Sequence, residues 1–147
     1  MFDKSFGIIP VCKSGNSHEF FLVHQITGHW AFPKGHKIGN ETEQETALRE
    51  FQEETGILQC QLVSDFRVIQ HYYFEENNQK IDKEVIFFLG FVGKNNNKPF
   101  IQNDEVQNGQ WFNYKDALLQ LTYPESQQTL VEAQSYLNKK YKNSENW

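Results

Sequence analysis

Apolar positions along this chain occur in short runs, and their spacing separates candidate strands from candidate helices. Runs of about four to eight residues that are rich in β-branched and aromatic side chains predict strands. We expect these strands at about residues 5–12, 19–25, 60–74, 84–92 and 109–113. Two longer stretches, at about 42–55 and 125–140, place apolar residues three and four positions apart, which predicts amphipathic helices.

Strands interspersed with two long helices predict an α/β or α+β sandwich. In the second helix, Pro124 suits the first turn, and a stripe of apolar residues is expected to be core: Leu130, Ala133 and Leu137. The polar segments 75–83 and 93–99 are expected to be loops between strands. With 147 residues, no repeat and no linker, residues 1–147 are expected to form a single domain.

Composition and charge limit the classes of ligand and the cellular location that fit this chain. The formal net charge is −5 and the arginines are Arg49 and Arg67, which argues against an extended nucleic-acid surface but not against a small nucleotide. The apolar runs are too short to span a membrane, and the first residues lack the pattern of a secretion signal, so a cytoplasmic location is expected. Cys12 and Cys60 lack metal-site spacing and are expected to be small buried hydrophobes.

The first helix carries an unusual concentration of carboxylates. Asn40 or Thr42 can cap its start, and Gly56 supplies a left-handed exit at its end. The spacing of Glu50, Glu53 and Glu54 puts all three on one flank, beside the flank that Ala47, Leu48 and Phe51 would dock on the sheet. Like charges at this spacing destabilise a helix, and a divalent cation such as Mg²⁺ is the compensation that best matches three converging oxygen ligands.

A solvated acidic face would explain the glutamates without any chemistry. The preceding loop favours the metal, because Gly35, Gly39 and Asn40 allow a folded backbone whose carbonyl can complete a metal site. Glu41 lies too far from Arg49 for a pair along the helix, so the two can meet only through the fold of this loop.

The same residues fill the motif G-x5-E-x7-R-E-U-x-E-E-x-G-U, and the chain therefore resembles the Nudix hydrolases. The positions that match are Gly35, Glu41, Arg49, Glu50, Phe51, Glu53, Glu54, Gly56 and Ile57. The resemblance implies an α/β/α sandwich with a mixed β-sheet that uses Mg²⁺ or Mn²⁺ to hydrolyse a nucleoside diphosphate linked to another group. It further implies that Glu50, Glu53 and Glu54 are metal ligands, and that Glu41 and Arg49 orient the loop and the helix.

The stretch HWAFPKGH, residues 29–36, is similar to one found in the asymmetric diadenosine tetraphosphate (Ap4A) hydrolases. This resemblance implies that the substrate is a dinucleoside polyphosphate, Ap4A, cleaved to ATP and AMP by water attack on phosphorus. We expect the protein to be a monomer. The resemblance places five residues beside the substrate: Lys34, His36 and Lys83 at the phosphates, and Tyr72 and Tyr123 around the base. Glu105, with Asp104 as its competitor, would supply a further carboxylate.

Alternatives remain at the level of sequence. Tyr72 and Tyr123 could instead be core rings, and Lys34 and His36 ordinary loop side chains. A 5'-end RNA pyrophosphohydrolase is the closest enzyme alternative, although few arginines are available for RNA phosphates. Hydrolysis of ADP-ribose or of an oxidised nucleotide is a further alternative. A nucleotide-sensing module without catalysis would be expected to lack a glutamate of the motif, and this chain lacks none.

Overall fold

Helices interspersed among the strands cover both faces of one sheet. A computed structural model describes residues 1–141. Its strands are β1 (Phe2–Ser14), β2 (Ser17–Gln25), β3 (Trp30–Ala31), β4 (Lys34–Gly35), β5 (Gln61–Glu76), β6 (Gln79–Phe91) and β7 (Val106–Asn113). Its α-helices are α1 (Glu43–Thr55), α2 (Tyr114–Gln120) and α3 (Pro124–Lys140), and a 3-10 turn, η1, covers Lys94–Asn96.

The sheet is mixed. Over residues 1–141 its strand order is β3-β2-β1-β6-β5, with β4 added beside β1 and β7 beside β2. Strands β1 and β6 run parallel, whereas the other pairs are antiparallel. The predicted sandwich with a mixed sheet is confirmed.

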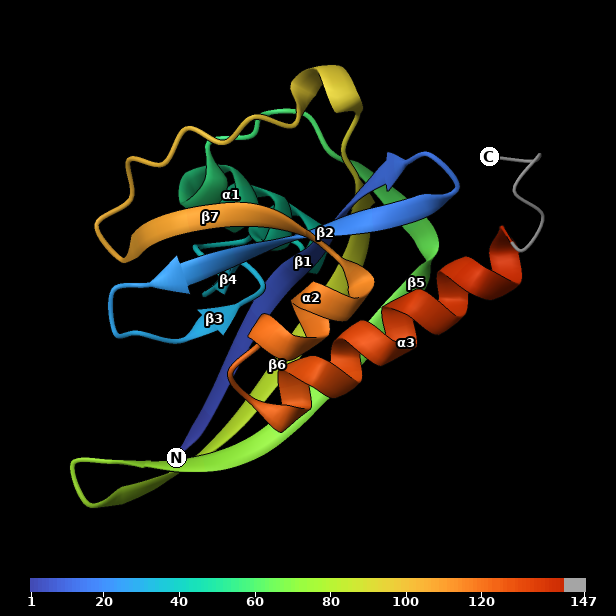
Figure 1. Ribbon diagram of the computed structural model, residues 1–147. Coiled ribbons are helices and arrows are strands. Elements are labelled where there is room, and N and C mark those ends of the chain that lie inside the picture. The colour runs from blue at the N-terminus through green and yellow to red at the C-terminus, as the bar shows by residue number, and fades with distance from the viewer. Residues whose placement is uncertain (142–147) are drawn as a thin grey trace.

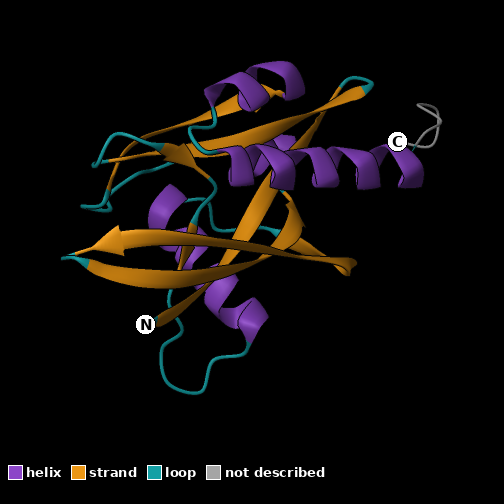
Figure 2. Ribbon diagram, turned by 90° about the horizontal axis from the view of Figure 1, so that it is seen from below, coloured by secondary structure: helices purple, strands orange, loops and turns teal. Residues whose placement is uncertain are grey.

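Alternation along the strands sends side chains into two separate cores. On one face Ile9 and Phe87 pack with Leu130 of α3, and on the other Ile8 and Ile86 pack with Phe51 of α1. Helices α2 and α3 lie in front of the sheet in Figure 1 and α1 lies behind it, and Figure 2 gives the same arrangement from below. The expected core stripe of α3 is confirmed, since Leu130, Ala133 and Leu137 are all fully buried.

The prediction of a loop at 75–83 is wrong. Strands β5 and β6 continue through most of this segment and are joined by a tight turn at Asn77 and Asn78, which adopt φ angles of 55° and 63°. Asparagine tolerates this left-handed conformation, so a two-residue hairpin turn is possible without glycine. Lys83 therefore lies inside β6 and not at the start of a strand.

Helix α2 was not expected from the sequence. It is seven residues long, and it starts where the Asn113 side chain accepts a hydrogen bond of 2.8 Å from the Asp116 N–H. Tyr114, Ala117 and Leu118 follow the helical spacing and pack on the core, but seven residues give only two turns, too few for the period to stand out from the neighbouring strand. Among residues 1–141, no helix has the length and apolar character needed to cross a membrane.

Candidate active site

Helix α1 is held at both ends by the residues that its sequence provides. Thr42, and not Asn40, is the N-cap: its hydroxyl accepts from the Glu45 N–H at 3.1 Å, and the Glu45 carboxylate accepts from the Thr42 N–H at 2.8 Å. Gly56 ends the helix with a φ of 74°. Ala47 and Phe51 are fully buried on the sheet, and this orientation turns the neighbouring glutamate flank toward β4.

The carboxylates of Glu50 and Glu54 lie side by side against the backbone of Gly35. A Cβ atom at Gly35 would overlap the Glu50 carboxylate, so a residue without a side chain is needed there. Glu54 is only 6% exposed, and burial, followed by the charge of Glu50, raises its pKa to about 8. Burial also raises the pKa of Glu50. Two carboxylates in contact, one buried and one partly buried, need a proton or a cation between them.

Arg49 ties the preceding loop to the helix. Its guanidinium donates to Glu41 at 2.7 Å, to Glu50 at 3.0 Å and to Glu53 at 3.1 Å, and it also binds the backbone carbonyl of His36 at 2.7 Å. Glu41 and Arg49 do meet through the fold of the loop, eight residues apart. Hydrogen bonds from Arg49, and then from the Ile38 N–H, lower the pKa of Glu41 to about 2.

Glu53 is not gathered with the other two glutamates. Arg49 holds its carboxylate on the outer side of the helix, where its side chain is 49% exposed. Within residues 1–141, no three His, Cys, Asp or Glu side chains converge closely enough to hold a metal ion as they stand. The pair formed by Glu50 and Glu54 nevertheless fits a hard divalent cation, because its donors are oxygen atoms whose charges are crowded and desolvated.

Lys34 links these carboxylates to a cavity on the other face of the sheet. Its backbone N–H binds Glu54, and its side chain lines the cavity. Strand β4 reaches this place because it pairs with β1 at Gly7, where any Cβ would come within 2.5 Å of the Pro33 carbonyl and 2.8 Å of the Lys34 Cβ. Burial, and then the charge of Lys83, lowers the pKa of Lys34.

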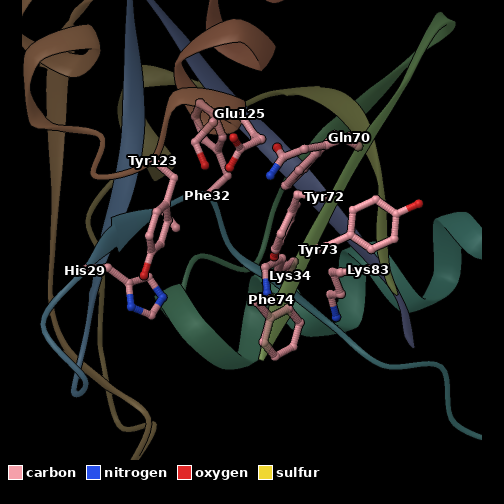
Figure 3. A pocket seen from close by; sticks show the side chains of 13 residues that line it. His29, Phe32, Lys34, Gln70, Tyr72, Tyr73, Phe74, Lys83, Tyr123 and Glu125 are labelled. Atoms are coloured by element: carbon pink, nitrogen blue, oxygen red, sulfur yellow. The ribbon is translucent and has the colours of Figure 1, made fainter. Parts of the chain in front are cut away.

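The cavity has a volume of about 370 Å³ and lies between the sheet and the start of α3. Figure 3 shows Tyr72 and Tyr123 along it, with Lys34 and Lys83 toward one end and Gln70 and Glu125 toward the other. Tyr123 is 47% exposed, so it is not a core ring. Facing aromatic rings suit a flat base, and the two ammonium groups suit an anion attached to it.

Two predicted site residues lie outside this arrangement. The ring of His36 does not line the cavity and instead binds Asp3 at 2.8 Å. Glu105 is exposed in the loop before β7, where its carbonyl accepts from the Ile26 N–H. The neighbouring Gln25 donates to Glu54 at 3.4 Å, so the Glu105 loop borders the carboxylate pair without a described contact to it.

Sequence reasoning missed His29, Gln70 and Glu125, which line the cavity, and Asp3, which binds Lys83. For His29 a signal was present, because it stands directly before Trp30 in the stretch that supplies Lys34. For the others no local signal exists, since each meets the site only through strand pairing or helix packing.

Three comparisons bear on this site. Residues 1–134 match the NUDIX domain. The mouse protein named asymmetrical bis(5'-nucleosyl)-tetraphosphatase is 36% identical over 135 residues, which cover 88% of this chain and 87% of the mouse protein. The crystal structure of a Caenorhabditis elegans Ap4A hydrolase binary complex superposes with a TM-score of 0.79 at 26% identity, covering 92% of this chain and 98% of that one. The NUDIX domain of Shewanella oneidensis NrtR, at 15% identity and a TM-score of 0.72, shares the fold.

Proposed function

The chain belongs to the NUDIX domain family, and on this premise we propose that it is a metal-dependent hydrolase that splits Ap4A asymmetrically into ATP and AMP. The mouse and C. elegans relatives, which carry the name of this activity, support the substrate. We propose Mg²⁺ or Mn²⁺ as the metal, and a monomeric cytoplasmic enzyme built from a single domain over residues 1–147.

One observation carries the proposal. Lys34 contacts Glu54 through its backbone and lines the aromatic cavity through its side chain. The cavity can take a nucleoside, and the carboxylates can take the metal that a pyrophosphate needs, so a single ligand with a base at one end and a polyphosphate beside it would fill both. A nucleoside polyphosphate is such a ligand.

Glu50 and Glu54 would hold the metal, together with Glu53 once it leaves Arg49, and with the carbonyl of Gly35. When bound, the cation would neutralise charge on the phosphate oxygens and make a water molecule easier to deprotonate. The raised pKa of Glu54 supports this assignment, because a cation between two crowded carboxylates removes the reason for keeping a proton there.

Side chains of the protein would bind and orient the substrate and accept the proton of the attacking water. Tyr72 and Tyr123 stack on an adenine, and Lys34 and Lys83 bind the phosphates, which fixes one phosphorus beside the carboxylates. Water attacks that phosphorus, its oxygen forms the new P–O bond, and its proton passes to a carboxylate of the cradle. The bridging P–O bond breaks, so that one product is ATP and the other is AMP.

The test is a substrate panel measured with and without Mg²⁺. We expect kcat/KM for Ap4A to exceed that for ADP-ribose and for a 5'-triphosphorylated RNA by at least tenfold, and we expect EDTA to abolish turnover. The matched control is Glu54→Gln, which keeps the volume of the side chain and removes its charge. A higher kcat/KM for the RNA would place the protein among RNA-processing enzymes and refute the proposal.

A further inference from the structure

The ammonium group of Lys83 is buried and already engaged. Lys83 is 4% exposed, and its Nζ donates to Asp3 Oδ2 at 2.6 Å and to Ser5 Oγ at 2.6 Å. A lysine has three N–H donors, so two are used and one is left for the cavity that the side chain lines. The direction of that remaining donor is set by Asp3 and Ser5.

Asp3 also binds His36, which was predicted to lie beside the substrate phosphates. Its Oδ1 lies 2.8 Å from His36 Nε2 while its Oδ2 holds Lys83, so one carboxylate joins a loop residue to a strand residue. Burial acts to raise the pKa of Asp3, but hydrogen bonds from Lys83 and His36 outweigh it and hold that pKa below its ordinary value. Asp3 is therefore ionised at neutral pH.

The placement of Asp3 is fixed by the sheet. Strands β1 and β6 run parallel with Asp3 directly opposite Lys83, and the Asp82 N–H donates to the Met1 carbonyl at 2.8 Å. Alternation along β1 turns Asp3 and Ser5 to the same face, which is also the face of Gly7 and of Lys34 beside it. The carboxylate thus stands where two lysines come together.

These lysines would repel each other without a counter-ion. Lys34 and Lys83 both line the cavity, and the Asp3 carboxylate, 2.6 Å from the Lys83 ammonium, supplies a negative charge beside them that offsets part of the repulsion. Removing the Asp3 carboxylate would leave the Lys83 ammonium with fewer acceptors in a buried place, next to another cation. The side chain would then turn away toward other acceptors, and that movement weakens a phosphate contact.

We propose that Asp3 is a positioning residue that acts through Lys83, aiming its free N–H at the polyphosphate. This inference rests on the proposed function. It opposes a simpler expectation, because an anion beside an anionic substrate should only repel it. Repulsion predicts that removing Asp3 raises kcat/KM, whereas positioning predicts that kcat/KM falls.

A double-mutant cycle distinguishes positioning of Lys83 by Asp3 from simple repulsion of the substrate by Asp3. We would measure kcat/KM for Ap4A with Mg²⁺ in the wild type, Asp3→Ala, Lys83→Met and the double variant, and the Kd of a methylene-bridged Ap4A analogue in the same four proteins by calorimetry. We expect Asp3→Ala to lower kcat/KM at least tenfold in the wild type and less than twofold in Lys83→Met. Asp3→Asn, which keeps an acceptor for Lys83, should recover part of the loss.

Lys4→Ala is the matched control. Lys4 is the next residue of β1, points to the other face and pairs with Glu84 at 3.6 Å, so we expect its removal to leave kcat/KM unchanged. An unchanged or raised kcat/KM in Asp3→Ala, or equal losses in both backgrounds, would overturn the inference while Ap4A cleavage by the wild type stands. If the wild type neither cleaves Ap4A nor binds the analogue, the proposed function and the inference both fall.

Discussion

Replacing Gly35 with alanine should separate activity from stability. A Cβ atom at this position would overlap the carboxylate of Glu50, far inside the 3.0 Å limit that real Cβ contacts respect. The overlapped group is the far end of a flexible side chain, and Gly35 does not adopt a positive φ, so Glu50 can swing aside at little cost in folding. We therefore expect the free energy of unfolding to change by less than about 1 kcal/mol.

The effect on turnover should be large. To reach ordinary contact, the Glu50 carboxylate must retreat by roughly 1 Å or more from the place beside Glu54, and a displacement of about 1 Å at a reacting centre can cost on the order of 100-fold in rate. That loss corresponds to about 2.7 kcal/mol of transition-state stabilisation. The assay is kcat for Ap4A at saturating Mg²⁺, alongside urea unfolding of the same preparation.

Gly56→Ala is the matched control, because it should behave in the opposite way. Gly56 has a φ of 74°, and a Cβ there would come within 2.6 Å of the Phe100 carbonyl carbon and 2.7 Å of the Phe100 nitrogen. Backbone atoms cannot swing aside, so we expect a loss of stability of about 2 kcal/mol or more.

For Gly35→Ala itself, a near-normal kcat in a folded protein would refute the role given to the position of Glu50.

Three other perturbations have defined outcomes. Glu54→Gln should fold with unchanged or raised stability, because a buried carboxylate beside Glu50 is removed. Its kcat should fall by about 100-fold or more. A variant with normal kcat would show that Glu54 is not a metal ligand. Tyr123→Ala should raise KM by roughly 5- to 150-fold at constant kcat, which is the loss expected for one stacked base, and an unchanged KM would exclude the ring from the substrate. Burial, and then the charge of Lys13, lowers the pKa of His18 to about 4. His18 therefore becomes protonated near pH 6.5 in the unfolded chain but only near pH 4 in the folded chain. The free energy of unfolding should therefore decrease as the pH falls from about 6.5 to 4, by roughly 3 kcal/mol more in the wild type than in His18→Phe. Urea titration of both proteins measures this difference, and parallel pH profiles would contradict it.

The first helix was predictable because its signals are local. The capping box of Thr42 and Glu45, the exit at Gly56 and the spacing of the glutamates all lie within fifteen residues, so a sequence pattern contains them. The local sequence also indicated that Gly35, Gly39 and Asn40 allow a folded backbone, and the structure places Gly35 against Glu50.

What the sequence could not predict depends on pairing between distant segments. Asp3 meets Lys83 across 80 positions through parallel pairing of β1 and β6, and no periodicity in either strand contains that register. The hairpin at 75–83 was misassigned for a different reason. Its residues are polar because most of them face solvent on both sides of a projecting ribbon, and polarity alone resembles a loop.

The central claim is that the carboxylate pair and the aromatic cavity form one site for Ap4A, and product identity tests it most directly. Ap4A would be incubated with the protein and Mg²⁺, and the nucleotides would be separated by ion-exchange chromatography at early times. We predict ATP and AMP in equal amounts, formed about 100-fold or more slowly by Glu54→Gln. Two molecules of ADP, or intact Ap4A after prolonged incubation, would contradict it.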